Sequence, residues 1–273
     1  MSSAPSSSRP SAKPAFDLDY SIHDFEADPY PDSQYLYRRI EEAMVAEGTQ
    51  RGGRTLDVAC GVGKLAIEVT ARGGEGWGLE PSKEMLGLGR YLYAQGRAVL
   101  VRGVAETLPF RDACFDRIIC QGALGHFVAP PDFMREAARV VRPDGRVIIA
   151  LANYESLSCK LGRGVRTISQ RVARRPASPH RAYWEMPLDH YHRGELAFVR
   201  ALGGACLQLE RCYGISLLWL LRGSDAWTWG KTLERLPRPL ASTFLVALDQ
   251  LAHYTPALAD MIISVWRPRR DAR

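Results

Sequence analysis

A regular alternation of short apolar runs and helix-length segments constrains the fold of this chain more than any other feature. The strand-like runs are Thr55–Cys60, Trp77–Glu80, Ala98–Gly103, Asp116–Gln121 and Arg146–Ala152. The helix-like segments between them are Leu65–Arg72, Lys83–Gln95 and Phe133–Val141. Consecutive strands joined by helices of that length require right-handed crossovers and a parallel sheet. The pattern therefore predicts an α/β fold whose first half is doubly wound.

The segments outside this alternation differ from it in composition. Residues 1–15 are rich in Ser and Pro and are expected to form a disordered tail, and a helical pattern follows from Ser33 to Gly48. Residues 153–191 are rich in Arg, Ser and Pro, whereas 217–259 are apolar and mainly helical in pattern. Met261–Trp266 reads as a last strand. We expect one domain over 16–273, with a core at 50–152 and with 153–191 and 217–259 as insertions that form a cap.

Composition excludes several classes of protein. The net charge is +6, but almost all the basic residues are Arg and no nucleic-acid-reading motif accompanies them, so no nucleic-acid partner is expected. No apolar stretch reaches the ~20 residues of a membrane-spanning helix.

The six cysteines lack metal-ligand spacing, so no metal site is expected. The cysteines are expected to be reduced, buried thiols of a cytoplasmic protein, and the N-terminus lacks the apolar region of a secretory signal. Peripheral membrane contact stays open, because six arginines lie in one segment: Arg163, Arg166, Arg171, Arg174, Arg175 and Arg181.

The strongest local motif is Leu56-Asp57-Val58-Ala59-Cys60-Gly61-Val62-Gly63, between the first strand and the first helix. Small residues there let the backbone approach a ligand closely, and the helix start offers N–H groups. Glu80 ends the second strand, about 20 residues on, where a carboxylate can hold two ribose hydroxyls. Ala66 stands where a pyrophosphate-binding fingerprint has its third glycine.

Four ordered blocks give the chain a specific resemblance: LDVACGVGKLA, GLEPSKEML, VRGVAETLPFRDACFDRIICQGALGHF and REAARVVRPDGRVIIA, all within 55–150. In these blocks the chain resembles class I S-adenosylmethionine-dependent methyltransferases, the group that includes quinone-biosynthesis C-methyltransferases. The resemblance implies a Rossmann-like sheet of seven strands with helices on both faces, a helical cap and an antiparallel last strand, which suits Met261–Trp266.

The resemblance also implies roles for the motif residues, with S-adenosylmethionine as the cofactor. Asp57 would anchor the methionine amino end, Glu80 would take the ribose hydroxyls, and Gln121 would face the transferring methyl group. The turn around the methionine portion would consist of Ala59, Gly61 and Gly63. Val104 stands where the family often has Asp or Asn, so adenine recognition would rest on the backbone near Ala105, on Glu106 or on packing.

The sulfonium already activates the methyl group, so a general base is needed only for an acceptor that must lose a proton. His126 follows the fourth strand and is our first candidate; His192 is the second, since His190, Tyr191 and His192 can fold over the same rim. The flanking segments would bind the acceptor, and their aromatic residues favour a small, apolar or aromatic metabolite (a natural product, quinone precursor or lipid): Phe25, Tyr30, Tyr35, Tyr37, Tyr183, Trp184, Trp219, Trp227, Trp229 and Tyr254.

The sequence leaves two alternatives to O- or C-methyl transfer open. One is a non-methylating enzyme, such as a cyclase, on the same scaffold, and Val104 is its only hint. The other is a binding or regulatory protein that keeps the fold and binds the cofactor weakly. The oligomeric state has no sequence signal.

Overall fold

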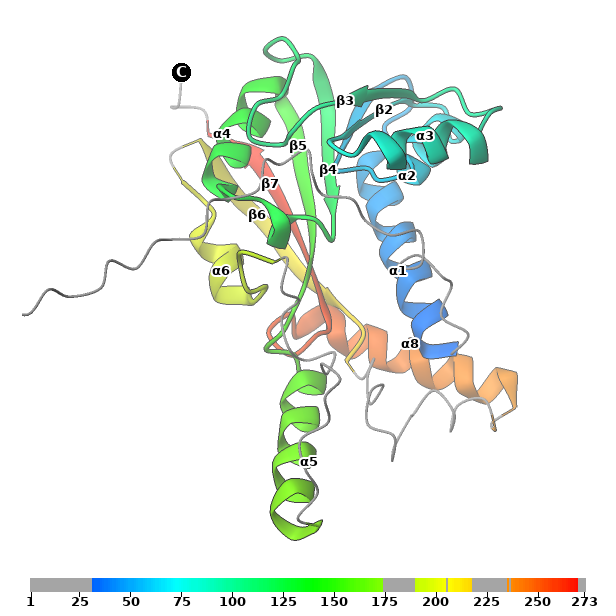
Figure 1. The fold of residues 1–273 in the computed structure, drawn as a ribbon, viewed down its shortest axis with the longest axis vertical. Helices are drawn as coiled ribbons and strands as arrows, with labels where there is room; N and C mark the ends of the chain where they lie inside the picture. Colours follow the sequence, from blue (N-terminus) through cyan, green and yellow to red (C-terminus); the bar gives the residue numbers. More distant parts are fainter. Residues whose placement is uncertain (1–30, 174–189, 205, 218–234, 236, 270–273) are drawn as a thin grey trace, which may run out of the picture.

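A computed structural model describes residues 31–173, 190–204, 206–217, 235 and 237–269, and the expected tail at 1–15 lies outside these ranges. Within them, seven strands form one sheet in the order β3-β2-β1-β4-β5-β7-β6 (Figure 1). The strands are β1 (Arg54–Val58), β2 (Glu75–Glu80), β3 (Val99–Arg102), β4 (Phe115–Gln121), β5 (Val141–Ala152), β6 (Leu207–Ile215) and β7 (Met261–Pro268).

Only β7 runs against the other strands of this sheet. It pairs antiparallel with β5 on one side and with β6 on the other, whereas β1 to β5 pair in parallel. The expected Rossmann-like sheet with an antiparallel last strand is thus confirmed. The strand order reverses between β1 and β4, and ligands of such sheets bind outside the carboxyl ends of the strands at this switch point.

Helices cover both faces of the sheet and bury separate apolar layers. The helices of the described residues are α1 (Pro31–Gly48), α2 (Lys64–Ala71), α3 (Lys83–Leu92), the short η3 (Leu124–His126), α4 (Pro130–Val140), α5 (Leu157–Ala173), α6 (Leu196–Ala201) and α8 (Arg238–Tyr254). Leu36, Ile40 and Met44 of α1 pack on Ile119 and Ile148 of the sheet. On the opposite face, α4 and α6 pack on residues such as Ile118 and Trp266. Successive residues of β4, such as Ile118 and Ile119, therefore pack in the apolar layers on opposite faces of the sheet, as the two-residue period of a strand requires.

The structure changes several expected boundaries. β5 begins at Val141, five residues before the expected Arg146, because Val141 pairs with Phe115 across an irregularity in the register. Within 153–191 the structure contains α5, which the Arg-, Ser- and Pro-rich composition did not predict. The helical pattern expected from Trp227 to Ala259 is observed as α8, and its first part lies outside the described residues. None of the described helices combines the length and the apolar character needed to cross a bilayer.

Candidate functional site

The strand register places three polar side chains on one face at the carboxyl edge of the sheet. Asp57 of β1 pairs with Gly78 of β2 and with Ile119 of β4. Glu80 and Gln121 follow these partners by two residues and end their strands. Since residues two apart point to the same face, all three side chains share the face that α1 and α2 cover. Asp57 and Glu80 are 2% and 5% exposed, so two acidic groups are buried at the switch point.

The turn between β1 and α2 has an unusual backbone. Ala59, Gly61 and Gly63 have φ angles of +57°, +55° and +82°. This left-handed region suits glycine, whereas an alanine there carries strain that is typical of ligand-binding turns. Gly63 caps α2 and provides no side chain to accept its first N–H groups. The turn therefore presents bare backbone toward the space beside Asp57 and Glu80.

Glu80 holds this turn in place. Its Oε2 accepts a hydrogen bond from the Gly61 amide at 2.9 Å, and its Oε1 accepts one from the Ser82 amide at 3.0 Å. Burial raises the pKa of Glu80, and the two backbone N–H groups oppose that rise. Each carboxylate oxygen has a second acceptor position, so Glu80 can bind two further donors, such as a pair of vicinal hydroxyls.

Asp57 has the more strongly perturbed carboxyl group. Burial raises its pKa well above the usual aspartate range, and the charge of Glu80 raises it further. Two neighbouring buried carboxyls, both with raised pKa values, are typical of a site for a cationic or hydrogen-bond-donating ligand.

A Gly63→Ala substitution is expected to destabilise the protein by about 1–3 kcal/mol, because it adds a left-handed alanine and a steric overlap. The new Cβ would lie 2.7 Å from Cδ2 of Leu100. Thermal unfolding measures the effect, with Gly87→Ala as control. Gly87 lies in α3 with nothing within 4 Å of its added Cβ, so that variant should be as stable as wild type or more so. Equal loss of stability in both variants would contradict this account of the turn.

The side-chain oxygen of Gln121 is buried without a hydrogen bond to the described part of the chain. Its Oε1 is shielded from solvent and has no hydrogen-bond partner among the described residues. A buried unsatisfied amide oxygen costs about 1–3 kcal/mol, so such atoms need an explanation. A ligand that donates to this oxygen, beside Asp57 and Glu80, is the simplest one.

The segment expected to contact adenine, residues 104–107, is held by contacts within the protein. Val104 forms an isolated bridge with Thr107, and Ala105 lies in the apolar core at 5% exposure. Oε1 of Glu106 accepts a hydrogen bond from the Val128 amide at 3.0 Å. Glu106 thus joins this loop to the segment that follows β4, and a role in adenine recognition stays a prediction.

Histidines from two distant segments meet beside this edge. Nε2 of His126 lies 3.0 Å from Nε2 of His190, and their ring centroids are 4.1 Å apart. The amides of Tyr191 and His192 both donate to the Gly125 carbonyl, so residues 190–192 lie against η3 as the sequence suggested. The His192 ring stacks on Phe198 instead, and its Nε2 lies 3.4 Å from the Val128 carbonyl oxygen. His190, which pairs with His126, was not among our first candidates; the two are 64 residues apart in sequence, and no local pattern connects them.

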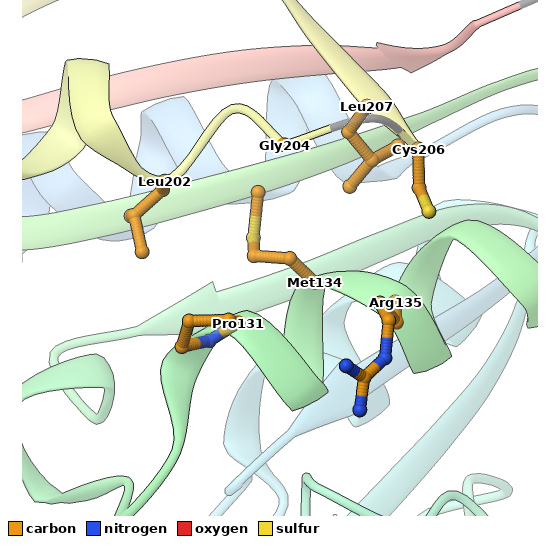
Figure 2. A pocket seen from close by; sticks show the side chains of 7 residues that line it. All are labelled: Pro131, Met134, Arg135, Leu202, Gly204, Cys206 and Leu207. Carbon is orange, nitrogen blue, oxygen red and sulfur yellow. The ribbon is translucent and has the colours of Figure 1, made fainter.

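A cavity of about 200 Å³ lies elsewhere, between α4 and the connection from α6 to β6 (Figure 2). Met134 and Leu207 line it, and both belong to the apolar layer on the face opposite Asp57 and Glu80. Figure 2 shows the Met134 side chain extending between the two segments. The cavity contains none of the polar groups of the candidate site and is separate from it.

Comparison with known proteins gives a consistent family for the core. Residues 56–149, about a third of the chain, match the family model described as a methyltransferase domain. An uncharacterized methyltransferase of Bacillus subtilis, YcgJ, is 32% identical over 136 residues, which is 44% of this chain and 53% of that protein. The ubiquinone/menaquinone biosynthesis C-methyltransferase UbiE of Geotalea daltonii is 36% identical over 104 residues, 36% of this chain and 44% of that protein. The chain thus spans about half the length of these relatives.

Solved structures extend the likeness of the fold beyond this core. Geranyl diphosphate C-methyltransferase from Streptomyces coelicolor A3(2), solved with Mg²⁺, geranyl diphosphate and S-adenosyl-L-homocysteine, superposes with a TM-score of 0.54. The match covers 86% of this chain and 82% of that one at 14% identity. At this identity the likeness concerns the fold.

Proposed function

We propose that this chain, whose residues 56–149 form a class I methyltransferase domain that uses S-adenosylmethionine, transfers a methyl group to O or C of a small, apolar or aromatic metabolite. The observation that carries the proposal is the pair of buried carboxyls, Asp57 and Glu80, beside a turn of left-handed residues at the switch point of the sheet. The sulfonium of the cofactor, when bound, supplies an electrophilic methyl group.

The residues of the site fit this cofactor. Glu80 accepts from the ribose hydroxyls through its two remaining acceptor positions, and Asp57 accepts from the methionine ammonium. Ala59, Gly61 and Gly63 pass around the methionine portion without side chains that obstruct it. Oε1 of Gln121, which has no hydrogen-bond partner among the described residues, would accept from the ammonium group or contact the polarised methyl group.

His126 is the proposed general base for an acceptor that must lose a proton. It follows β4 at the edge where Gln121 ends that strand, and His190 holds its Nε2 at 3.0 Å. One ring of such a pair donates and the other accepts, so His190 orients His126 and fixes which nitrogen holds the proton. His192 is the second candidate, although its ring stacks on Phe198 and not on His126.

A His126→Gln variant is expected to lose about 10²–10⁴-fold in kcat, the usual contribution of general-base catalysis, with cofactor affinity retained. Steady-state kinetics and a separate cofactor titration measure the two effects. Arg90→Gln is the control, since Arg90 is exposed in the last turn of α3 and should leave kcat unchanged. An unchanged kcat in His126→Gln would remove this residue from the mechanism.

The size and polarity of the acceptor are inferred from the flanks of the core. Of the aromatic residues expected to bind it, Tyr35 and Tyr37 lie on α1 and Tyr254 lies on α8, and the others lie outside the described residues. The Tyr37 and Tyr254 side chains are 48% and 82% exposed. The acceptors of UbiE and of geranyl diphosphate C-methyltransferase, a quinone precursor and an isoprenoid by their names, support an apolar or isoprenoid class. We propose that 153–191 and 217–259 together cover the acceptor.

The test is transfer of isotope from S-adenosylmethionine with a labelled methyl group to small molecules of a cell extract, followed by mass spectrometry. The proposal predicts a product that is heavier by one labelled methyl group and disappears with Glu80→Gln. A different product without the label would favour the cyclase-like alternative. Cofactor binding without any turnover would favour a binding protein.

A further inference from the structure

Helix α5 stands away from the body of the protein. Figure 1 shows it projecting beyond the end of β5, and among its described side chains none after Gly162 is buried. Leu161 and Ile168 are 44% and 63% exposed. A helix of this length gains little stability by itself in water, since most helical stability in proteins comes from packing. The exposed part of α5 therefore calls for a partner.

Helix α8 presents a second exposed apolar face. Leu240, Phe244, Leu251 and Tyr254 recur at the spacing of one helical face and are 59, 39, 56 and 82% exposed. The opposite face of α8 is packed: Asp249 is buried, its Oδ2 accepts from Nε of Arg39 at 2.8 Å, and its Oδ1 accepts from the Ser216 amide.

The two helices are joined at one corner. The Leu157 amide at the start of α5 donates to the Leu258 carbonyl just after α8, at 2.9 Å. The Asn153 side chain donates to the Ala259 carbonyl at 2.8 Å. The exposed apolar residues on the two sides of this joint, which we call the α5–α8 corner, are Leu161, Ile168, Leu251, Tyr254 and Leu258.

The charges around this corner have one sign. α5 contains Lys160, Arg163, Arg166 and Arg171 and no acidic residue, and the only acid of α8 is the buried Asp249. Glu155, just before α5, pairs with Arg163 and Arg193, so the positive charge of α5 rests mainly on Lys160, Arg166 and Arg171. Apolar side chains surrounded by cations, with no exposed carboxylate on either helix, match the requirements of an anionic lipid surface.

We infer that the α5–α8 corner docks on an anionic lipid surface, with the apolar side chains in the interface and the α5 cations at the headgroups. The corner lies beyond the end of β5, and β1, β2 and β4 run parallel to β5 in the sheet. The inference does not depend on methyl transfer.

Cosedimentation with vesicles tests the inference without cofactor or acceptor. We expect binding to vesicles of phosphatidylcholine mixed with phosphatidylglycerol, weaker binding at high salt, and little binding to phosphatidylcholine alone. The double variant Leu251→Glu with Tyr254→Glu should bind at least about tenfold more weakly, and Lys160→Gln about fivefold more weakly. Tyr91→Glu is the matched control, because Tyr91 is 81% exposed on α3 and should leave binding unchanged.

Near-ultraviolet circular dichroism establishes whether each variant is folded. If the double variant does not fold, Ile168→Glu takes its place. Equal binding to both kinds of vesicle, or unchanged binding by the corner variants, would overturn the inference. It would also be overturned if sedimentation equilibrium showed a wild-type dimer that the double variant dissociates while neither binds vesicles. In that case a second copy of the chain covers the corner.

Discussion

A Glu80→Gln variant will bind S-adenosylmethionine about a hundredfold more weakly than wild type, or worse, because it loses charge-assisted hydrogen bonds in a buried site. The Glu80 carboxylate accepts from the amides of Gly61 and Ser82. An amide side chain has one acceptor oxygen, so its NH₂ group would face one of these N–H groups. The substitution therefore removes a ribose acceptor and loosens the turn.

Isothermal titration calorimetry measures this loss directly. Glu84→Gln is the matched control, since Glu84 is exposed in the first turn of α3 and its substitution changes the net charge by the same amount. Wild-type affinity in Glu80→Gln would refute the assignment of the ribose site. A loss in both variants would indicate an effect of charge alone.

An Asp57→Asn variant is expected to change stability and binding in opposite directions. Burial and the charge of Glu80 raise the pKa of Asp57, so the ionised carboxylate is costly in the folded protein. Removing that charge should stabilise the cofactor-free protein by about 1 kcal/mol or more, which corresponds to a rise in Tm of about 2–4 °C per kcal/mol. Affinity for the cofactor should fall about tenfold or more, because the ammonium group loses its counter-charge.

The stability gained by Asp57→Asn depends on pH. A folded-state pKa above the unfolded value means that the folded protein binds the extra proton, so stability is lost as pH rises through that interval. The difference in Tm between Asp57→Asn and wild type should therefore grow from acidic to neutral pH. Asp144→Asn, an exposed control at the start of β5, should show no such trend. A lower Tm for Asp57→Asn at neutral pH would contradict the account.

Much of the sheet and of the cofactor site could be predicted from the sequence because their signals are local. Buried strands appear as short apolar runs, and the two-residue period places Asp57 and Gln121 on one face once β1 and β4 are paired. The chirality of parallel crossovers then leaves few topologies. The strand order and the antiparallel β7 follow from these patterns together with the family resemblance.

The features that the sequence did not predict depend on contacts between distant segments. His190 meets His126 only because the Tyr191 and His192 amides bind the Gly125 carbonyl. Glu106 contacts Val128 across 22 positions. Helix α5 is different, because Leu157, Leu161, Val165, Ile168 and Val172 do recur at helical spacing, but the Arg-, Ser- and Pro-rich composition of 153–191 obscured this pattern. Tertiary packing decides the two contacts, and no local pattern encodes them.

The most direct test of the central claim is a calorimetric titration of the wild-type chain with S-adenosyl-L-homocysteine. The account predicts saturable binding of one ligand per chain, with affinity that rises with pH as the raised pKa values of Asp57 and Glu80 are passed. An absence of binding heat and of thermal stabilisation at saturating ligand would contradict the claim that this edge of the sheet holds the cofactor.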